Sequence, residues 1–205
     1  MDIFCRPNVF LEIVSNISQI ENLEWLASEI HEKREKTEKT IIYCQNINSA
    51  VNMYEYFGAK KRLVPYVNVY HAHTSQTLRD NILNDLKREN SEIRVLIATV
   101  AFGLGINIPD IVRIIHWGNP GSIQEYWQEV GRCARSIQSG RALMYRTSGS
   151  INKAKTTLDM INLVQGEACI RLSVLNYFKF ESMSENSIQN VVGGEKCCSR
   201  CQINV

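Results

Sequence analysis

The sequence lacks the features that would assign the chain to a membrane, a secretory route or a strongly charged partner. None of its apolar runs approaches the ~20 residues that span a bilayer. Near the N-terminus, Asn8, Glu12 and Asn16 interrupt the apolar residues, so a signal-peptide pattern is absent as well. The 23 basic and 21 acidic residues almost cancel and leave a net charge of +2. We therefore expect no membrane partner, and any nucleic-acid surface must be local.

Seven cysteines stand out in a chain of 205 residues that shows no secretion signal. In a reducing compartment, clustered cysteines indicate a metal site rather than disulfides. The length and the hydrophobic share of 44% suit one ordinary domain with a sizeable core, plus a small appendage. The sequence has no internal repeat and no low-complexity tract.

Strand and helix patterns alternate along most of the chain. Continuous apolar runs of strand length are followed by segments with helical periodicity. The predicted strands lie at 41–44, 67–70, 93–98, 112–116 and 141–145, and the predicted helices at 21–36, 45–57, 74–88, 122–133, 153–164 and 168–178. Such alternation predicts an α/β fold with helices on both faces of a parallel sheet. In sheets of this kind, function collects at the carboxyl ends of the strands.

The segment from Val95 to Arg141 carries the strongest functional pattern. Its first apolar run ends at Thr99, and glycines follow where the backbone must turn. After a second strand comes a helix pattern with three polar side chains spaced by four and three, Gln128, Arg132 and Arg135. These intervals place them on one helix face, or on one face plus the turn that ends the helix. Two guanidiniums on one face need an anion, and a nucleotide phosphate is the best candidate.

Two motifs in this segment resemble those of RecQ-type ATP-dependent DNA helicases. Residues 98–106 read ATVAFGLGI and resemble the fifth motif of that family, and residues 128–135 read QEVGRCAR and resemble the sixth. Both motifs sit in the second RecA-like domain of such helicases. The resemblance implies a second RecA-like domain at 1–149 and a helical zinc-binding subdomain at 150–205. The start of the chain, RPN before an alternating apolar stretch, resembles the linker into that domain and equally suits an ordinary edge strand.

By the resemblance, the sixth motif serves the nucleotide. Arg135 looks like the arginine finger that stabilises charge on the transferring phosphoryl group. Arg132 would bind the γ-phosphate or hold the motif helix, and Gln128 would link the nucleotide to the fifth motif, where Gly105 and Asn107 would touch it. The alternative is a surface helix in which the arginines pair with Glu125 or Glu129, which explains the spacing but not the neighbouring AFGLGI.

The resemblance also implies DNA contacts at two strand ends. Thr99 looks like a contact to the DNA backbone, and His71 keeps the first histidine of the family's YHAG pattern, which reads YHAH here. His71 and His73 share a face of an extended strand and could hold a metal. Two ligands without a nearby third make a poor metal site, so we favour a DNA contact at His71.

The C-terminal cysteines resemble the zinc site of the same family. CIRLSVLNYF begins at Cys169 and resembles the segment that opens the zinc-binding subdomain, while CCSRC holds Cys197, Cys198 and Cys201. Four thiolates suit tetrahedral Zn²⁺, and Cys198-x-x-Cys201 has the spacing of a metal knuckle. We predict that this segment depends on zinc for folding. Reduced structural cysteines are the alternative reading.

The 205 residues contain no P-loop pattern and no DEAH-like carboxylate box. We therefore predict the carboxyl-side half of a RecQ-like helicase, inactive alone, which shares ATP and Mg²⁺ with a first RecA-like domain in cis or trans. The resemblance implies 3′-to-5′ unwinding of single-stranded and forked DNA in repair and recombination. It also implies the nucleus of a eukaryote, or the cytoplasm of a prokaryote.

Two other functions remain open on the sequence. The family's arginine after the cysteine of the fourth motif is missing, since Asn46, Ile47 and Asn48 follow Cys44, and Asn107 replaces an aspartate. These departures favour a non-catalytic DNA- or protein-binding module that kept the fold. An RNA helicase of the same superfamily is the third possibility, and the cysteine-rich tail weighs against it.

Overall fold

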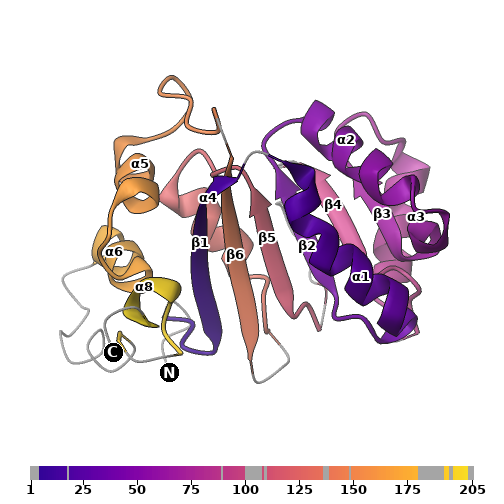
Figure 1. Cartoon of the computed structure of the whole chain (residues 1–205), viewed down its shortest axis with the longest axis horizontal. Coiled ribbons are helices and arrows are strands. Elements are labelled where there is room, and N and C mark those ends of the chain that lie inside the picture. The colour runs from indigo at the N-terminus through magenta and orange to yellow at the C-terminus, as the bar shows by residue number, and fades with distance from the viewer. Residues whose placement is uncertain are drawn as a thin grey trace.

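The computed structural model describes residues 5–17, 19–88, 90–99, 108, 110–135, 139–147, 149–179, 192–193 and 196–202. Its centre is one six-stranded sheet in the order β1-β6-β5-β2-β4-β3, and every pair of neighbouring strands is parallel (Figure 1). The strands are β1 (Val9–Ile17), β2 (Thr40–Cys44), β3 (Val67–Tyr70), β4 (Val95–Thr99), β5 (Arg113–Trp117) and β6 (Gly140–Thr147). The predicted parallel α/β sheet is confirmed, and β1 forms an edge strand beside β6.

Helices cover both faces of this sheet. They are α1 (Glu24–Lys33), α2 (Ile47–Gly58), α3 (Gln76–Leu86), α4 (Ile123–Val130), α5 (Leu158–Gln165), α6 (Ile170–Tyr177) and α8 (Ser199–Gln202), with 3-10 turns η1 (Ile20–Leu23), η2 (Arg34–Lys36) and η3 (Lys61–Tyr66). Four helices begin at a residue whose side-chain oxygen accepts a hydrogen bond from a backbone N–H three positions on, Asn46, Ser75, Ser122 and Thr157. Such caps satisfy an N–H group that the first helical turn leaves without a partner.

The alternation of side chains along β2 divides the core into two layers. Ile41 and Tyr43 pack with residues of α3, α4, α5 and α6 on one face, whereas Ile42 and Cys44 pack with α1 and α2 on the other. All five residues of β2 are buried, as expected for a central parallel strand covered on both faces. None of the described helices is long and apolar enough to cross a membrane.

Two helices are shorter than their sequence patterns indicate. The pattern at 153–164 predicts one helix, but α5 begins only at Leu158, after its cap Thr157. Before it, the carbonyl of Asn152 accepts from Lys155 and Thr156, which closes a separate turn. The pattern at 122–133 likewise ends early, because α4 stops at Val130 and a tight turn carries residues 131–134.

The C-terminal segments pack beside β1 (Figure 1). The Leu11 N–H donates to the carbonyl of Cys197 at 3.3 Å, and Leu11 forms a parallel bridge with Cys198. Both α6 and α8 contact β1, so its outer edge is largely covered. Covering an edge strand in this way removes a template for pairing with another chain. The predicted domain boundary between residues 149 and 150 stays a prediction.

A fully buried arginine joins these segments. Arg171 on α6 is 0% exposed. One guanidinium nitrogen donates to the carbonyls of Cys5 at 2.7 Å and Arg6 at 2.8 Å, and another donates to those of Val9 and, at 3.1 Å, Cys197. A buried charge is tolerated only when hydrogen bonds replace its water. Arg171 therefore orients the start of β1 and the cysteine segment together.

We expect Arg171→Met to lower the free energy of unfolding by at least about 3 kcal/mol, because it leaves several buried carbonyls without a donor. Urea denaturation followed by circular dichroism measures the loss. Arg88→Met is the matched control, since the Arg88 side chain is 70% exposed, and its effect should stay within about 0.5 kcal/mol. Equal losses in the two variants would contradict the anchoring role of Arg171.

Candidate functional site

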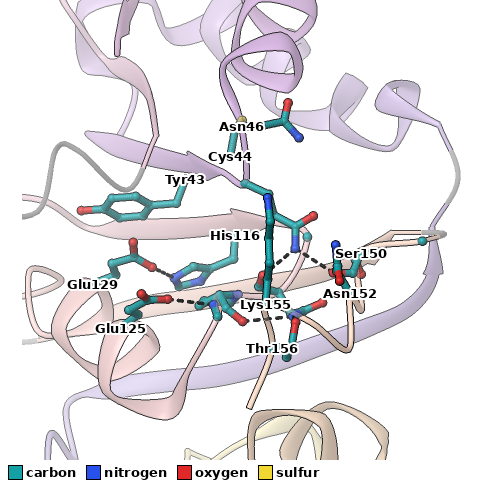
Figure 2. A pocket seen from close by; sticks show the side chains of 16 residues that line it. Tyr43, Cys44, Asn46, His116, Glu125, Glu129, Ser150, Asn152, Lys155 and Thr156 are labelled. Carbon is teal, nitrogen blue, oxygen red and sulfur yellow. Dashed lines mark hydrogen bonds and ion pairs between the residues drawn. The ribbon is translucent and has the colours of Figure 1, made fainter. Parts of the chain in front are cut away.

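A polar pocket of about 370 Å³ opens at the carboxyl edge of the sheet (Figure 2). The ends of β2 and β5, the loop after β6 and the start of α4 form its walls. Its lining side chains include amides, hydroxyls, two carboxylates and one lysine, namely Gln45, Asn46, Asn119, Asn152, Ser150, Thr156, Glu125, Glu129 and Lys155. The pocket thus lies where parallel sheets usually place function.

Gln45 ties the walls of this pocket together. Its side-chain N–H groups donate to the carbonyls of Asn119 at 2.7 Å and Ser150 at 2.8 Å. The Gln45 side chain packs directly against Gly118, whose φ is +88°. A Cβ at Gly118 would lie 2.6 Å from the side-chain Cδ of Gln45, so only glycine fits there.

Three buried polar atoms that line this pocket have no hydrogen-bond partner among the described residues. They are the side-chain oxygens of Asn119 and Ser150 and the Nδ1 nitrogen of His116. The three residues are 1%, 3% and 1% exposed, respectively. Buried polar atoms are rarely left unsatisfied in native proteins. The pocket is therefore suited to a polar ligand or to ordered water that supplies these bonds.

A buried hydrogen bond between His116 and Glu129 joins β5 to α4 on the wall of the pocket. The Nε2 of His116 lies 2.9 Å from a carboxylate oxygen of Glu129, and both side chains are almost fully buried. The His116 ring stacks on the Tyr43 ring with 5.7 Å between the ring centroids. The Tyr126 ring packs against it with a centroid distance of 5.2 Å. The sequence patterns do not reveal this pair, since Glu129 was expected only as a surface partner for the arginines.

The sixth-motif residues lie on α4 and in the turn that ends it. Gln128 is exposed on the last turn of the helix, and Arg132 is 8% exposed. Arg135 is exposed, and its Nε donates to the carbonyl of Gly131 at 2.9 Å. Burial raises the pKa of Tyr43, while the charges of Arg132 and Arg135 act in the opposite direction. Since α4 ends at Val130, Arg132 and Arg135 stand in the turn after the helix, which is the second of the two placements that their spacing allows.

Two small residues of the sixth motif, Cys133 and Ala134, hold the turn after α4 in place. Cys133 is buried, and its thiol donates to the carbonyl of Val112 at 3.1 Å. Ala134 has a φ of +51°, a conformation that glycine adopts more easily, and its N–H donates to the carbonyl of Ile111 at 2.7 Å. The turn is thus held against the segment that leads into β5.

The predicted contacts of the fifth motif are only partly within the described residues. Gly105 and Asn107 lie outside them. Thr99 ends β4 and is 7% exposed. His71 follows β3, and its Nδ1 accepts from the backbone N–H of His73 at 3.2 Å. His71 and Thr99 end neighbouring strands, so both stand at the same carboxyl edge of the sheet, and their DNA contacts remain predictions.

The four C-terminal cysteines come together as the sequence indicates. The sulfurs of Cys169, Cys197, Cys198 and Cys201 all lie within 4.8 Å of one another. The distances are 3.5 Å from Cys169 to Cys197, 3.8 Å from Cys169 to Cys198 and 3.5 Å from Cys198 to Cys201. Sulfur contacts from Cys169 and Cys197 hold the pKa of Cys198 well below its usual range.

Residues 21–136 match the model of the helicase conserved C-terminal domain. The chain belongs to the helicase C-terminal domain family. Within that family it is similar to RecQ-type helicases. It is 29% identical to mouse "Bifunctional 3'-5' exonuclease/ATP-dependent helicase WRN", over 97% of this chain and 15% of that protein. It is 27% identical to "ATP-dependent DNA helicase RecQ" of Haemophilus influenzae, over 85% of this chain and 29% of that protein. The chain therefore spans less than a third of these relatives.

A solved structure confirms the fold assignment. The chain superposes on domain 2 of the DEAD-box helicase Mss116p, which is bound to an RNA duplex, with a TM-score of 0.60. The match covers 92% of this chain and 70% of that one at 15% identity. Such low identity supports the RecA-like fold alone. The predicted RecA-like architecture is thus confirmed, and the sequence similarity to WRN and RecQ bears out the predicted resemblance to RecQ-type helicases.

We expect Gly118→Ala to lower the free energy of unfolding by about 2 kcal/mol. The alanine would have to adopt the positive φ of this position, and its Cβ would displace the Gln45 side chain. Thermal and urea denaturation measure the change. Gly58 is the matched control, since a Cβ at this last residue of α2 would meet no atom within 4 Å. Gly58→Ala should be neutral or stabilising by up to about 1 kcal/mol. A Gly118→Ala variant as stable as Gly58→Ala would contradict the described packing.

Proposed function

We propose that this chain is the carboxyl-side half of a RecQ-like ATP-dependent DNA helicase. The placement of the sixth-motif residues carries the proposal. Arg132 and Arg135 lie together in the turn after α4, near Tyr43 at the end of β2. The similarity to RecQ and WRN, which are named as ATP-dependent helicases, supports the same assignment.

In this proposal Arg135 is the arginine finger for a nucleotide held by a first RecA-like domain. Its exposure leaves the guanidinium able to reach across a cleft, and its Nε bond to Gly131 limits the directions it can take. Arg132 is more buried and would meet the γ-phosphate from a fixed position, beside Gln128. When bound, Mg²⁺ neutralises phosphate charge. The arginines stabilise the remaining negative charge as it develops.

The same edge of the sheet would form part of the DNA track. Thr99 and His71 follow neighbouring strands, and the pocket near Asn46 and Lys155 offers amide, hydroxyl and ammonium groups. Such groups bind phosphates and base edges of a single strand. We propose single-stranded and forked DNA as the substrate and 3′-to-5′ unwinding in repair and recombination as the role. The compartment would be the eukaryotic nucleus or the prokaryotic cytoplasm.

The four-cysteine cluster fits Zn²⁺. Sulfurs about 2.3 Å from a tetrahedral Zn²⁺ stand roughly 3.8 Å from one another. Three of the sulfur pairs here lie at 3.5–3.8 Å, and all of the pairs lie within 4.8 Å. Cys169, Cys197, Cys198 and Cys201 would hold the ion. Zinc there would join α6 to the segment that bridges to β1, and so it would serve as a structural platform.

The finger proposal predicts the behaviour of Arg135→Ala in a polypeptide that carries both helicase halves. DNA-stimulated ATP hydrolysis should fall by roughly three to five orders of magnitude. The affinity for a single-stranded oligonucleotide should change little, because Arg135 would touch only the nucleotide. A phosphate-release assay and fluorescence anisotropy measure the two quantities.

Arg88→Ala, at an exposed position just after the end of α3, is the matched control and should keep both activities. The 205-residue chain alone should show no ATP hydrolysis above background, since its sequence contains no P-loop pattern. If Arg135→Ala retained wild-type turnover, Arg135 would have no role as a finger.

The zinc proposal predicts about one Zn²⁺ per chain by elemental analysis, lost on Cys198→Ser together with much of the stability. Cys44→Ala provides the control, because Cys44 is buried on β2, far along the sheet from the cluster. Burial raises the pKa of the Cys44 thiol to about 12, and Cys44 is not among the four clustered sulfurs, so its replacement should leave the zinc content unchanged. Equal zinc content in Cys198→Ser and the parent chain would refute the site.

A non-catalytic binding module is the second candidate. The missing arginine after Cys44 and the asparagine at position 107 favour it. The two functions differ in one observable. The measurement is the affinity of a polypeptide with both helicase halves for single-stranded DNA. An affinity that falls with salt but does not change when a nucleotide is added would support the module.

A further inference from the structure

The His116–Glu129 pair stands between the pocket and the turn that carries Arg132. Both side chains line the pocket, His116 from β5 and Glu129 from α4. Their contact of 2.9 Å is almost fully buried. A buried carboxylate without a partner is strongly destabilising, so Glu129 depends on His116. The position of the last turn of α4 therefore depends on the pair.

Aromatic rings fix the orientation of His116. Tyr43 stacks on the ring with an interplanar angle of 20° (Figure 2). The Tyr126 ring packs against it with 5.2 Å between the ring centroids. The imidazole cannot turn away from Glu129 without displacing these rings, since Tyr43 and Tyr126 are both buried. The pair thus behaves as one rigid connection between β5 and α4.

The connection continues into the turn that holds Arg132. The Arg132 N–H donates to the carbonyl of Glu129 at 3.1 Å, so the backbone of the two residues forms one short turn. Arg132 also acts on Tyr43, the ring that stacks on His116. A shift of the His116–Glu129 pair must therefore move Arg132, whose backbone and surroundings both depend on it.

We propose that His116 is a positioning residue that couples a group bound in the pocket to Arg132 through Glu129. A DNA strand at the carboxyl edge would lie against the pair, because both of its side chains belong to the pocket wall. This inference rests on the proposed function, in which Arg132 serves the nucleotide. It adds a physical route from the DNA side of the domain to the nucleotide side.

The test uses the 205-residue chain with ¹⁵N-labelled histidine and arginine and an oligothymidylate of about eight nucleotides. NMR follows the side-chain signals of His116 and Arg132, and fluorescence anisotropy measures binding separately. His116→Leu removes the donor to Glu129, whereas His116→Gln keeps an N–H at a similar reach. Glu129→Gln serves as a second variant if His116→Leu does not fold.

We expect the oligonucleotide to shift the His116 ring and Arg132 signals in the parent chain and the Arg132 signal in His116→Gln. The affinity of the His116→Leu variant for the oligonucleotide should lie within about threefold of the parent affinity. In this variant the oligonucleotide should leave the Arg132 signal unshifted. A response of Arg132 in His116→Leu equal to that of the parent, or no response in a parent chain that binds the strand, would overturn the coupling. If the parent does not bind the strand at all, the proposed function fails, and the coupling fails with it.

Discussion

Strand direction is the constraint on which the rest of this structure depends. Because all six strands are parallel, every connection must cross a face of the sheet, and every carboxyl end points to the same edge. Gln45 after β2 can thus reach the carbonyl of Ser150 after β6, although 105 positions separate them. Reversing β2, β5 or β6 would remove the loop that follows it from the pocket.

Much of the fold could be predicted from the sequence because local patterns decide it. The apolar run at 67–70 coincides with β3, and the runs at 41–44 and 112–116 differ from β2 and β5 by one residue. The spacing of Gln128, Arg132 and Arg135 also anticipated a helix and its closing turn. These features depend on the periodicity of apolar residues and on helix-capping residues. Both can be read from a short segment without knowledge of its distant contacts.

Long-range contacts decide what the sequence did not reveal. Lys39 ends the charged sequence KREKTEK at 33–39, which is typical of a solvated surface, yet its ammonium is buried, donates to the carbonyl of Leu86 at 3.0 Å and pairs with Asp110. Gln45 and Arg171 likewise look ordinary in sequence. All of their hydrogen-bond partners except Cys197 lie 74 or more positions away, and no local pattern indicates such pairings. The metal-type cysteines were easier to predict, since their own chemistry restricts what they do.

The hydrogen bonds of Arg171 also bear on the order in which the chain acquires its structure during synthesis. The segment that begins with Cys5 leaves the ribosome before the other strands of this sheet, but its carbonyls find their donor only 166 positions later. The strand partner of β1 is also made late, since Val9 pairs with Gly140. Contacts so distant in sequence form slowly. Within this sheet, β1 is therefore made before the other five strands but is among the last to be secured, and until then its apolar residues need protection from aggregation.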